Sequence, residues 1–228
     1  MDKYSLMVPN FIPSGEYFDP KHSDTCIGCG VSLAARLVGK ALEKAFSSAV
    51  CERRSGADLF GVKTDAAFMR IKKGKDELTI CFDDEPSNKL QDALVKTLPA
   101  VAVAEGISYV ATASPSYPFD LMEKVQRAMD AEGSAYIHIL TPCPSAWQFP
   151  TEDTVKVGFK AVETLAFPLY EISSGFYNLT NKTLKPRAIE EYISAQGRFS
   201  KVKAAEVKSA AATVAKEYKK LIEKVQPE

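Results

Sequence analysis

The chain has 228 residues, with 29 basic and 29 acidic side chains and a sequence pI near 6.8. Its length suits a domain with a sizeable buried core, and its balanced charge gives no indication of a nucleic acid or an anionic membrane as partner. No apolar run is long enough to span a membrane, and residues 1–4 do not begin a signal peptide. We therefore expect a cytoplasmic protein.

The first predicted element is a helix over residues 33–47, because apolar residues recur there with helical period after Ser32, a candidate N-cap. A short apolar run from Leu78 to Phe82 predicts a buried strand. The elements expected after it are a helix over 89–105 broken near Pro99, a strand over 107–113, a helix over 118–131, a strand over 135–140, strands and turns around 168–172 and 176–179, and helices over 187–196 and 201–225.

This alternation of strands and helices predicts an α/β fold, with a mostly parallel sheet and helices on both faces. Ligand sites in such sheets collect at the carboxyl ends of the strands. Three segments are expected at that edge: Asp83-Asp84-Glu85, residues 114–117, and Thr141-Pro142-Cys143-Pro144. The last helix carries few apolar residues larger than alanine. We expect it to lie on a partner subunit or to be a solvated terminal arm.

Four of the five cysteines are candidate metal ligands. Two lie in a Cys-Ile-Gly-Cys-Gly turn whose glycines free the backbone to wrap a metal, ahead of the positive end of the first helix. Soft thiolates in a tetrahedral arrangement bind zinc or an iron-sulfur cluster, and the spacing leaves both open. The candidates are Cys26, Cys29, Cys51 and Cys143.

Three other residues near these motifs have simpler interpretations. Cys81 lies inside an apolar strand, so we expect a small buried hydrophobe rather than a ligand. His138 alternates with isoleucines on a strand and is expected to make a satisfied hydrogen bond on the opposite face. Trp147, just beyond Cys143, is expected to shield the site from water.

Six motifs occur in an order that resembles one family. They are residues 26–30 (Cys-Ile-Gly-Cys-Gly), 80–85 (Ile-Cys-Phe-Asp-Asp-Glu), 106–114, 136–147, 168–171 (Pro-Leu-Tyr-Glu) and 192–199. Together they resemble the β subunit of 2-oxoacid:ferredoxin oxidoreductases of the pyruvate synthase type, over about residues 22–205. The resemblance implies a thiamine diphosphate-binding-like fold, a partner α-type subunit, and ferredoxin or a similar electron acceptor. It also implies thiamine diphosphate with magnesium and a 4Fe-4S cluster, whose ligands would be Cys26, Cys29, Cys51 and Cys143.

The chain departs from the family where the diphosphate binds. The family's Gly-Asp-Gly loop is missing between Cys51 and the strand at 78, and its Asn-Thr-Gly turn is replaced by Pro86-Ser87-Asn88-Lys89. Magnesium requires oxygen ligands in near-octahedral geometry, and two usual suppliers are lost. The remaining candidates for cofactor contact are Asp83, Asp84 and Asn88. We therefore expect a reduced fold that does not bind thiamine diphosphate with magnesium by itself.

These features predict a β-type subunit of a 2-oxoacid:ferredoxin oxidoreductase complex, whose 4Fe-4S cluster transfers electrons during oxidative decarboxylation of a 2-oxoacid. Two alternatives stay open: a catalytically complete subunit with a rearranged cofactor site, and a non-catalytic assembly module whose cysteines hold zinc. The expected division is an N-terminal extension at 1–21, an α/β iron-sulfur domain at 22–185 and a C-terminal helical arm at 186–228.

Overall fold

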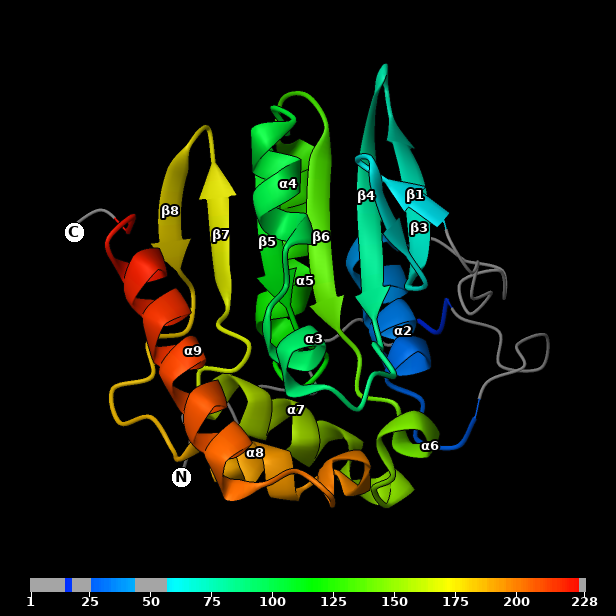
Figure 1. Ribbon diagram of the computed structural model, residues 1–228. Helices are drawn as coiled ribbons and strands as arrows, with labels where there is room; N and C mark the ends of the chain where they lie inside the picture. The colour runs from blue at the N-terminus through cyan, green and yellow to red at the C-terminus, as the bar shows by residue number, and fades with distance from the viewer. Residues whose placement is uncertain (1–14, 18–25, 44–56, 226–228) are drawn as a thin grey trace.

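A computed structural model describes residues 15–17, 26–43 and 57–225 of the chain. Helices and strands alternate through most of it (Figure 1), which confirms the predicted α/β class. The elements are α2 (Gly30–Leu42), β1 (Ala57–Leu59), β2 (Val62–Thr64), β3 (Ala67–Lys73), β4 (Asp76–Asp83), α3 (Leu90–Leu94), α4 (Leu98–Ala104), β5 (Tyr109–Ala113), α5 (Pro118–Asp130), β6 (Ala135–Leu140), α6 (Pro144–Trp147), η3 (Thr151–Asp153), α7 (Thr154–Glu163), β7 (Tyr170–Ser173), β8 (Phe176–Leu179), α8 (Ile189–Ser194), η4 (Gly197–Phe199) and α9 (Ala204–Ile222).

The main sheet has six strands in the order β3-β4-β6-β5-β7-β8. Its centre is parallel, since β6 pairs in parallel with both β4 and β5. The outer strands β3, β7 and β8 pair antiparallel, so the sheet as a whole is mixed. The carboxyl ends of β4, β6 and β5 reach the lower edge of the sheet, where α6, α7 and α8 lie (Figure 1).

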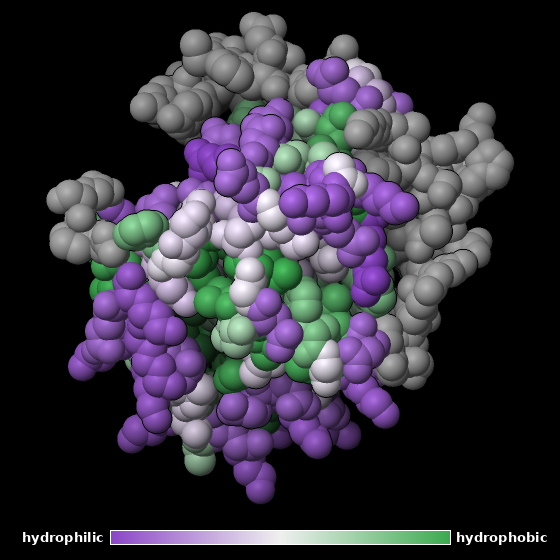
Figure 2. All heavy atoms as spheres, turned by 90° about the horizontal axis from the view of Figure 1, so that it is seen from above, coloured by the Kyte–Doolittle hydropathy of each residue, from purple (hydrophilic) through white to green (hydrophobic). Residues whose placement is uncertain are grey.

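Both faces of the sheet are covered, as predicted. On one face, α2 and α5 pack against each other and against apolar side chains of β4, β5 and β6. On the other face, α4 and the residues around β1 and β2 cover a smaller cluster that includes Cys81 and Tyr136. Seen from above, apolar side chains gather in the middle of the molecule with hydrophilic ones around them (Figure 2). That view faces the end of the sheet opposite the candidate ligand edge.

A third apolar cluster lies along the lower edge and joins α7, α8 and α9 to Trp147 and Phe149. Only Ala210 and Val214 of α9 are buried, which agrees with the few large apolar residues of this helix. The division of the chain at residues 21 and 185 stays a prediction. No helix of the described residues is both long and apolar enough to cross a bilayer.

Two local predictions were wrong in detail. The N-cap of α2 is Cys29 rather than Ser32, so the helix begins directly after the cysteine turn. The first helix also ends earlier than predicted, at Leu42, where Glu43 forms a left-handed C-cap; residue 47 lies outside the described residues. The predicted break near Pro99 is confirmed, because α3 ends at Leu94 and α4 begins at Leu98. The break precedes Pro99 because proline fits the first turn of a helix, where its missing N–H has no acceptor to bind.

Candidate functional site

The Cys26–Cys29 turn is fixed against the start of α7. The Cys29 amide donates to the Cys26 carbonyl at 3.2 Å, which closes the turn. Gly28 has a φ of +73°, in the left-handed region that favours glycine, and a Cβ there would lie 2.4 Å from the Thr151 carbonyl oxygen. The hydroxyl of Thr154 donates to the Gly28 carbonyl at 2.6 Å. Only glycine therefore fits the middle of this turn.

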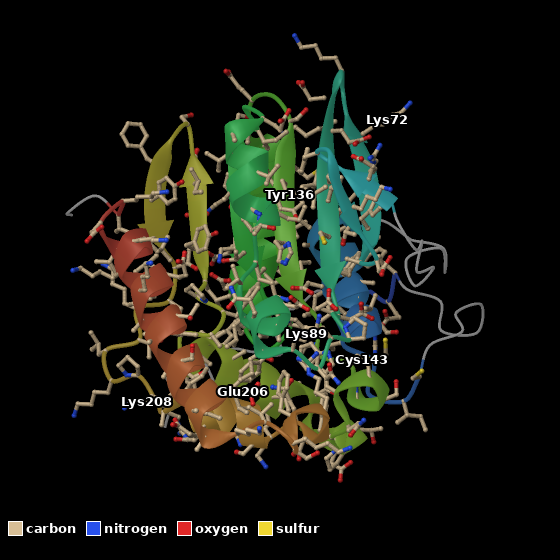
Figure 3. The ribbon with its side chains drawn as sticks, viewed as in Figure 1. Lys72, Lys89, Tyr136, Cys143, Glu206 and Lys208 are labelled. Carbon is tan, nitrogen blue, oxygen red and sulfur yellow. The ribbon has the colours of Figure 1, made fainter. Side chains whose placement is uncertain are left out.

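The loop that carries Cys143 lies directly against the same turn. The Gly30 amide donates to the Pro142 carbonyl at 3.2 Å, and a Cβ on Gly30 would come within 2.5 Å of that oxygen. Cys143 is the N-cap of α6, and its Sγ is 3.5 Å from Ser145 Oγ. Figure 3 shows Cys143 at the lower edge of the sheet, whereas Tyr136 lies in its middle. Two cysteine segments that are far apart in sequence thus meet at the predicted edge.

The candidate ligands differ in exposure. Cys26 is exposed, and Cys29 and Cys143 are partly buried. Cys51 lies outside the described residues, so its predicted role stays a prediction. Within the described ranges no three His, Cys, Asp or Glu side chains are grouped closely enough to hold a metal ion. Each thiolate of a 4Fe-4S cluster binds a different iron, so its four ligands stand farther apart than those of one ion.

Cys81 is confirmed as the buried cysteine that is not a ligand candidate. It is fully buried in β4, away from the cysteine turn. Burial, with the nearby charge of Asp83, raises the pKa of the Cys81 thiol to about 12. Because metals bind the thiolate, a thiol that stays protonated is a poor ligand.

The carboxylate of Asp83, at the end of β4, is already paired within the chain. The Nζ of Lys96 and the Nε2 of His138 lie 2.8 Å and 3.0 Å from Oδ2 of Asp83, and the Glu85 amide donates to Oδ1 at 3.1 Å. Burial disfavours the charged carboxylate, but Lys96 and His138 outweigh that effect and hold the pKa of Asp83 well below its usual range. The prediction that His138 is satisfied is confirmed, since its other ring nitrogen lies 2.8 Å from the Tyr136 hydroxyl.

Of the other two candidates for cofactor contact, Asp84 lies beside Asp83 and Asn88 does not. Asp84 is buried, at 8% exposure. It lines a small cavity of about 160 Å³ with Asp83 and Lys96. Asn88 is exposed and lines a different groove with Arg198. The structure therefore does not bring Asp83, Asp84 and Asn88 together around one cavity.

Arg198 and Trp147 fix the loop that follows β4, and no sequence pattern predicts their contact. The indole N–H of Trp147 donates to the Glu85 carbonyl at 2.9 Å, and Arg198 donates to the same carbonyl and to that of Ser87. The guanidinium stacks over the Trp147 ring at 4.1 Å. Trp147 is 1% exposed, as a shielding role requires. Both residues lie in motifs quoted above, but only the fold reveals that they meet.

Comparisons with known proteins find relatives among subunits of pyruvate synthase and of ketoisovalerate oxidoreductase. Pyruvate synthase subunit PorB of Methanothermobacter marburgensis is 47% identical over 109 residues, which cover 48% of this chain and 38% of that protein. The predicted resemblance is confirmed. PorB of Thermotoga maritima is 35% identical over 57% of this chain and 39% of its own length. Ketoisovalerate oxidoreductase subunit VorB of Pyrococcus furiosus is 34% identical over 53% of this chain and 40% of its own length.

The chain spans about two-fifths of the length of the PorB and VorB subunits that it matches. A comparison with models of protein families gives no match.

Proposed function

We propose that this chain is a β-type subunit of a 2-oxoacid oxidoreductase, and that its own chemistry is electron transfer through one 4Fe-4S cluster. The observation that carries the proposal is the hydrogen bond from Gly30 to Pro142, which holds the Cys26–Cys29 turn against the Cys143 loop at the carboxyl edge of the sheet. Relatives named as subunits of pyruvate synthase and ketoisovalerate oxidoreductase support the reaction class.

The residues at this edge fit an iron-sulfur cluster. The donor set is made of soft thiolates, which favour iron-sulfur clusters and zinc over hard cations. Close backbone contacts at Gly28 and Gly30 fix the segments that present these thiolates. Cys26, Cys29, Cys51 and Cys143 would hold the cluster, which would accept and release one electron at a time. The chain's role would be to position it and limit its contact with water.

The residues present do not fit a magnesium-bridged diphosphate. A hard cation needs several oxygen ligands that converge. The carboxylate of Asp83 is instead held by Lys96 and His138, and Asn88 faces another groove. We infer that any decarboxylation in the complex depends on thiamine diphosphate held by another chain.

Calorimetric titration of the isolated subunit with thiamine diphosphate and magnesium tests this inference. We expect no saturable heat, because loss of one well-placed charged contact in a buried site costs about 2 to 5 kcal/mol, and two such suppliers are replaced here. Titration of a thiamine diphosphate enzyme that is known to bind the cofactor serves as the positive control. Stoichiometric binding that is lost in Asp84→Asn would support the catalytically complete subunit instead.

Metal analysis separates the proposal from the assembly-module alternative. Anaerobically purified chain is expected to be brown, with about four iron and four sulfide per polypeptide. A colourless protein with one tightly bound zinc would indicate the zinc module.

The chain is also proposed to work beside an α-type subunit and to pass electrons to ferredoxin or a similar acceptor. Three exposed apolar side chains lie on the cysteine turn or on α7, the helix whose first residue bonds to that turn: Ile27 at 83%, Val155 at 40% and Phe159 at 38% exposure. The hydrogen bond between Thr154 and Gly28 joins this turn to α7, the helix that carries the other two. Apolar groups gathered beside a candidate centre are typical of a surface that a partner covers.

We expect Phe159→Asp to reduce the amount of partner subunit recovered with the tagged full-length chain at least several-fold, because a charge would be buried in the interface. Phe176→Asp is the matched control, since Phe176 is also exposed, at 60%, but lies in the β7–β8 hairpin. Unchanged iron content and thermal unfolding would show that both variants are folded. Equal partner recovery from the two variants would contradict this placement of the interface.

A further inference from the structure

Two buried hydroxyls in the described part of the chain have no hydrogen-bond partner: Ser32 Oγ and Thr141 Oγ1. Both lie beside candidate cluster ligands, since Ser32 follows Cys29 by one helical turn and Thr141 comes two residues before Cys143. Buried hydroxyls are nearly always hydrogen-bonded in folded proteins. Two such exceptions at one edge of the sheet indicate that a hydrogen-bond acceptor from outside the chain binds there.

The usual partner of Ser32 is already engaged. A serine inside a helix commonly donates to the carbonyl four residues earlier, but Ser32 is the third residue of α2 and that carbonyl belongs to Gly28, which lies before the helix. That carbonyl accepts the hydroxyl of Thr154 at 2.6 Å, and the Cys29 carbonyl accepts the Leu33 amide at 3.1 Å. Ser32 instead lines a pocket of about 420 Å³ together with Cys26 and Cys29. Its hydroxyl is therefore free to donate to a group held by those cysteines.

We propose that Ser32 donates a hydrogen bond to a sulfur of the cluster, either a ligand thiolate or an inorganic sulfide, and thereby raises the cluster's reduction potential. This inference rests on the proposed function, because it requires the cluster. Hydrogen bonds to sulfur are one of the factors that set the potential of such clusters. One-electron reduction increases the negative charge on the sulfurs, so a donated hydrogen bond stabilises the reduced form more than the oxidised form. Ser32 acts here as a positioning residue and not as a ligand.

The test is an anaerobic redox titration of the full-length chain, followed by electron paramagnetic resonance. In Ser32→Ala we expect full iron and sulfide content and a lower midpoint potential. The equilibrium constant for reduction should fall about tenfold, which corresponds to about 59 mV for a one-electron couple. Ser32→Thr, which keeps a hydroxyl, should restore most of the potential. Ser209→Ala is the matched control, because Ser209 is exposed on α9, and it should leave the potential unchanged.

The outcomes separate this inference from the proposed function. A wild-type chain without iron and sulfide would overturn the proposed function and this inference with it. A complete cluster with the same potential in Ser32→Ala and wild type would overturn the role of Ser32 alone. If Ser32→Ala does not retain a cluster, the potentials of Ser32→Thr and Ser32→Val are compared instead. Threonine and valine have nearly the same shape, and only threonine carries a hydroxyl. Equal potentials in that pair would also overturn the inference.

Discussion

Replacing any one of Cys26, Cys29, Cys51 and Cys143 by serine is expected to abolish the 4Fe-4S cluster or to convert it to a form with fewer irons. Each ligand binds a separate iron, and a serine hydroxyl is a much poorer ligand for that iron than a thiolate. Iron should fall below about four per chain, and sulfide should fall with it in any variant that loses the whole cluster. The measurements are iron and sulfide analysis and the visible absorption of anaerobically prepared protein.

Cys81→Ser is the matched control for this series. The Cys81 thiol is fully buried in β4, and its raised pKa, about 12, keeps it protonated. The variant should therefore retain the full cluster even if it is somewhat less stable. Loss of iron in Cys81→Ser, or full iron content in any of the other four variants, would contradict the proposed ligand set.

The central elements could be predicted because their local patterns and their tertiary roles agree. The strand at β4 is a continuous apolar run, and α5 combines a clear helical period with a glycine stop soon after its end, at Gly133. The parallel pairing of β4, β6 and β5 follows from the alternation of these strands with helices. Their carboxyl ends then place Asp83 and Cys143 at one edge without further information.

Other elements were missed for identifiable reasons. The edge strand β3 is half-exposed and carries Arg70, Lys72 and Lys73, so its sequence does not resemble a buried strand. The helix α7 contains β-branched residues and Gly158, which lower helix propensity. Tertiary packing explains that glycine, because a Cβ on Gly158 would lie 2.1 Å from Ser116 Oγ. A contact of this kind cannot be read from a local pattern.

The residues of the candidate site also divide into those that a local sequence pattern reveals and those that only the fold reveals. Cys26 and Cys29 could be named from the sequence because a Cys-x-x-Cys turn is typical of metal or redox chemistry. Lys96 could not, because it lies in the break between α3 and α4 and its importance comes only from its distance to Asp83. The sequence predicts Ser32 as a helix cap, and only the fold shows that its hydroxyl is buried without a partner among the described residues.

The Lys96–Asp83 pair is expected to make a large, pH-dependent contribution to stability. The side chains are only 13% and 7% exposed, and removing one partner of a buried pair commonly costs about 3 to 5 kcal/mol. We expect Lys96→Met to lower the free energy of unfolding at pH 7 by about this amount, since Asp83 would keep only His138 and the Glu85 amide. Urea unfolding at pH 7 measures the change.

Lys156→Met is the matched control for this substitution. Lys156 is 65% exposed and lies 3.4 Å from Asp153, so its ion pair is worth about 0 to 1 kcal/mol. The double variant Asp83→Asn/Lys96→Met should be less destabilised than the sum of its single variants, because neither charge is left unpaired. If the double variant instead loses the sum of the two single losses in unfolding free energy, the two charges contribute to stability independently.

The pH dependence of the unfolding free energy follows from the direction in which folding shifts the pKa of Asp83. Its pKa is lower in the folded chain than in the unfolded chain, where an aspartate has a pKa of about 4. The stabilisation is therefore fully present above that pH, and it is lost as the pH falls further and protons bind preferentially to the unfolded state. Asp83→Asn should be less stable than wild type at pH 7, and the difference should narrow below about pH 4. A difference that stayed constant from pH 7 to pH 3 would show that the lost stability comes from packing rather than from the charge of Asp83.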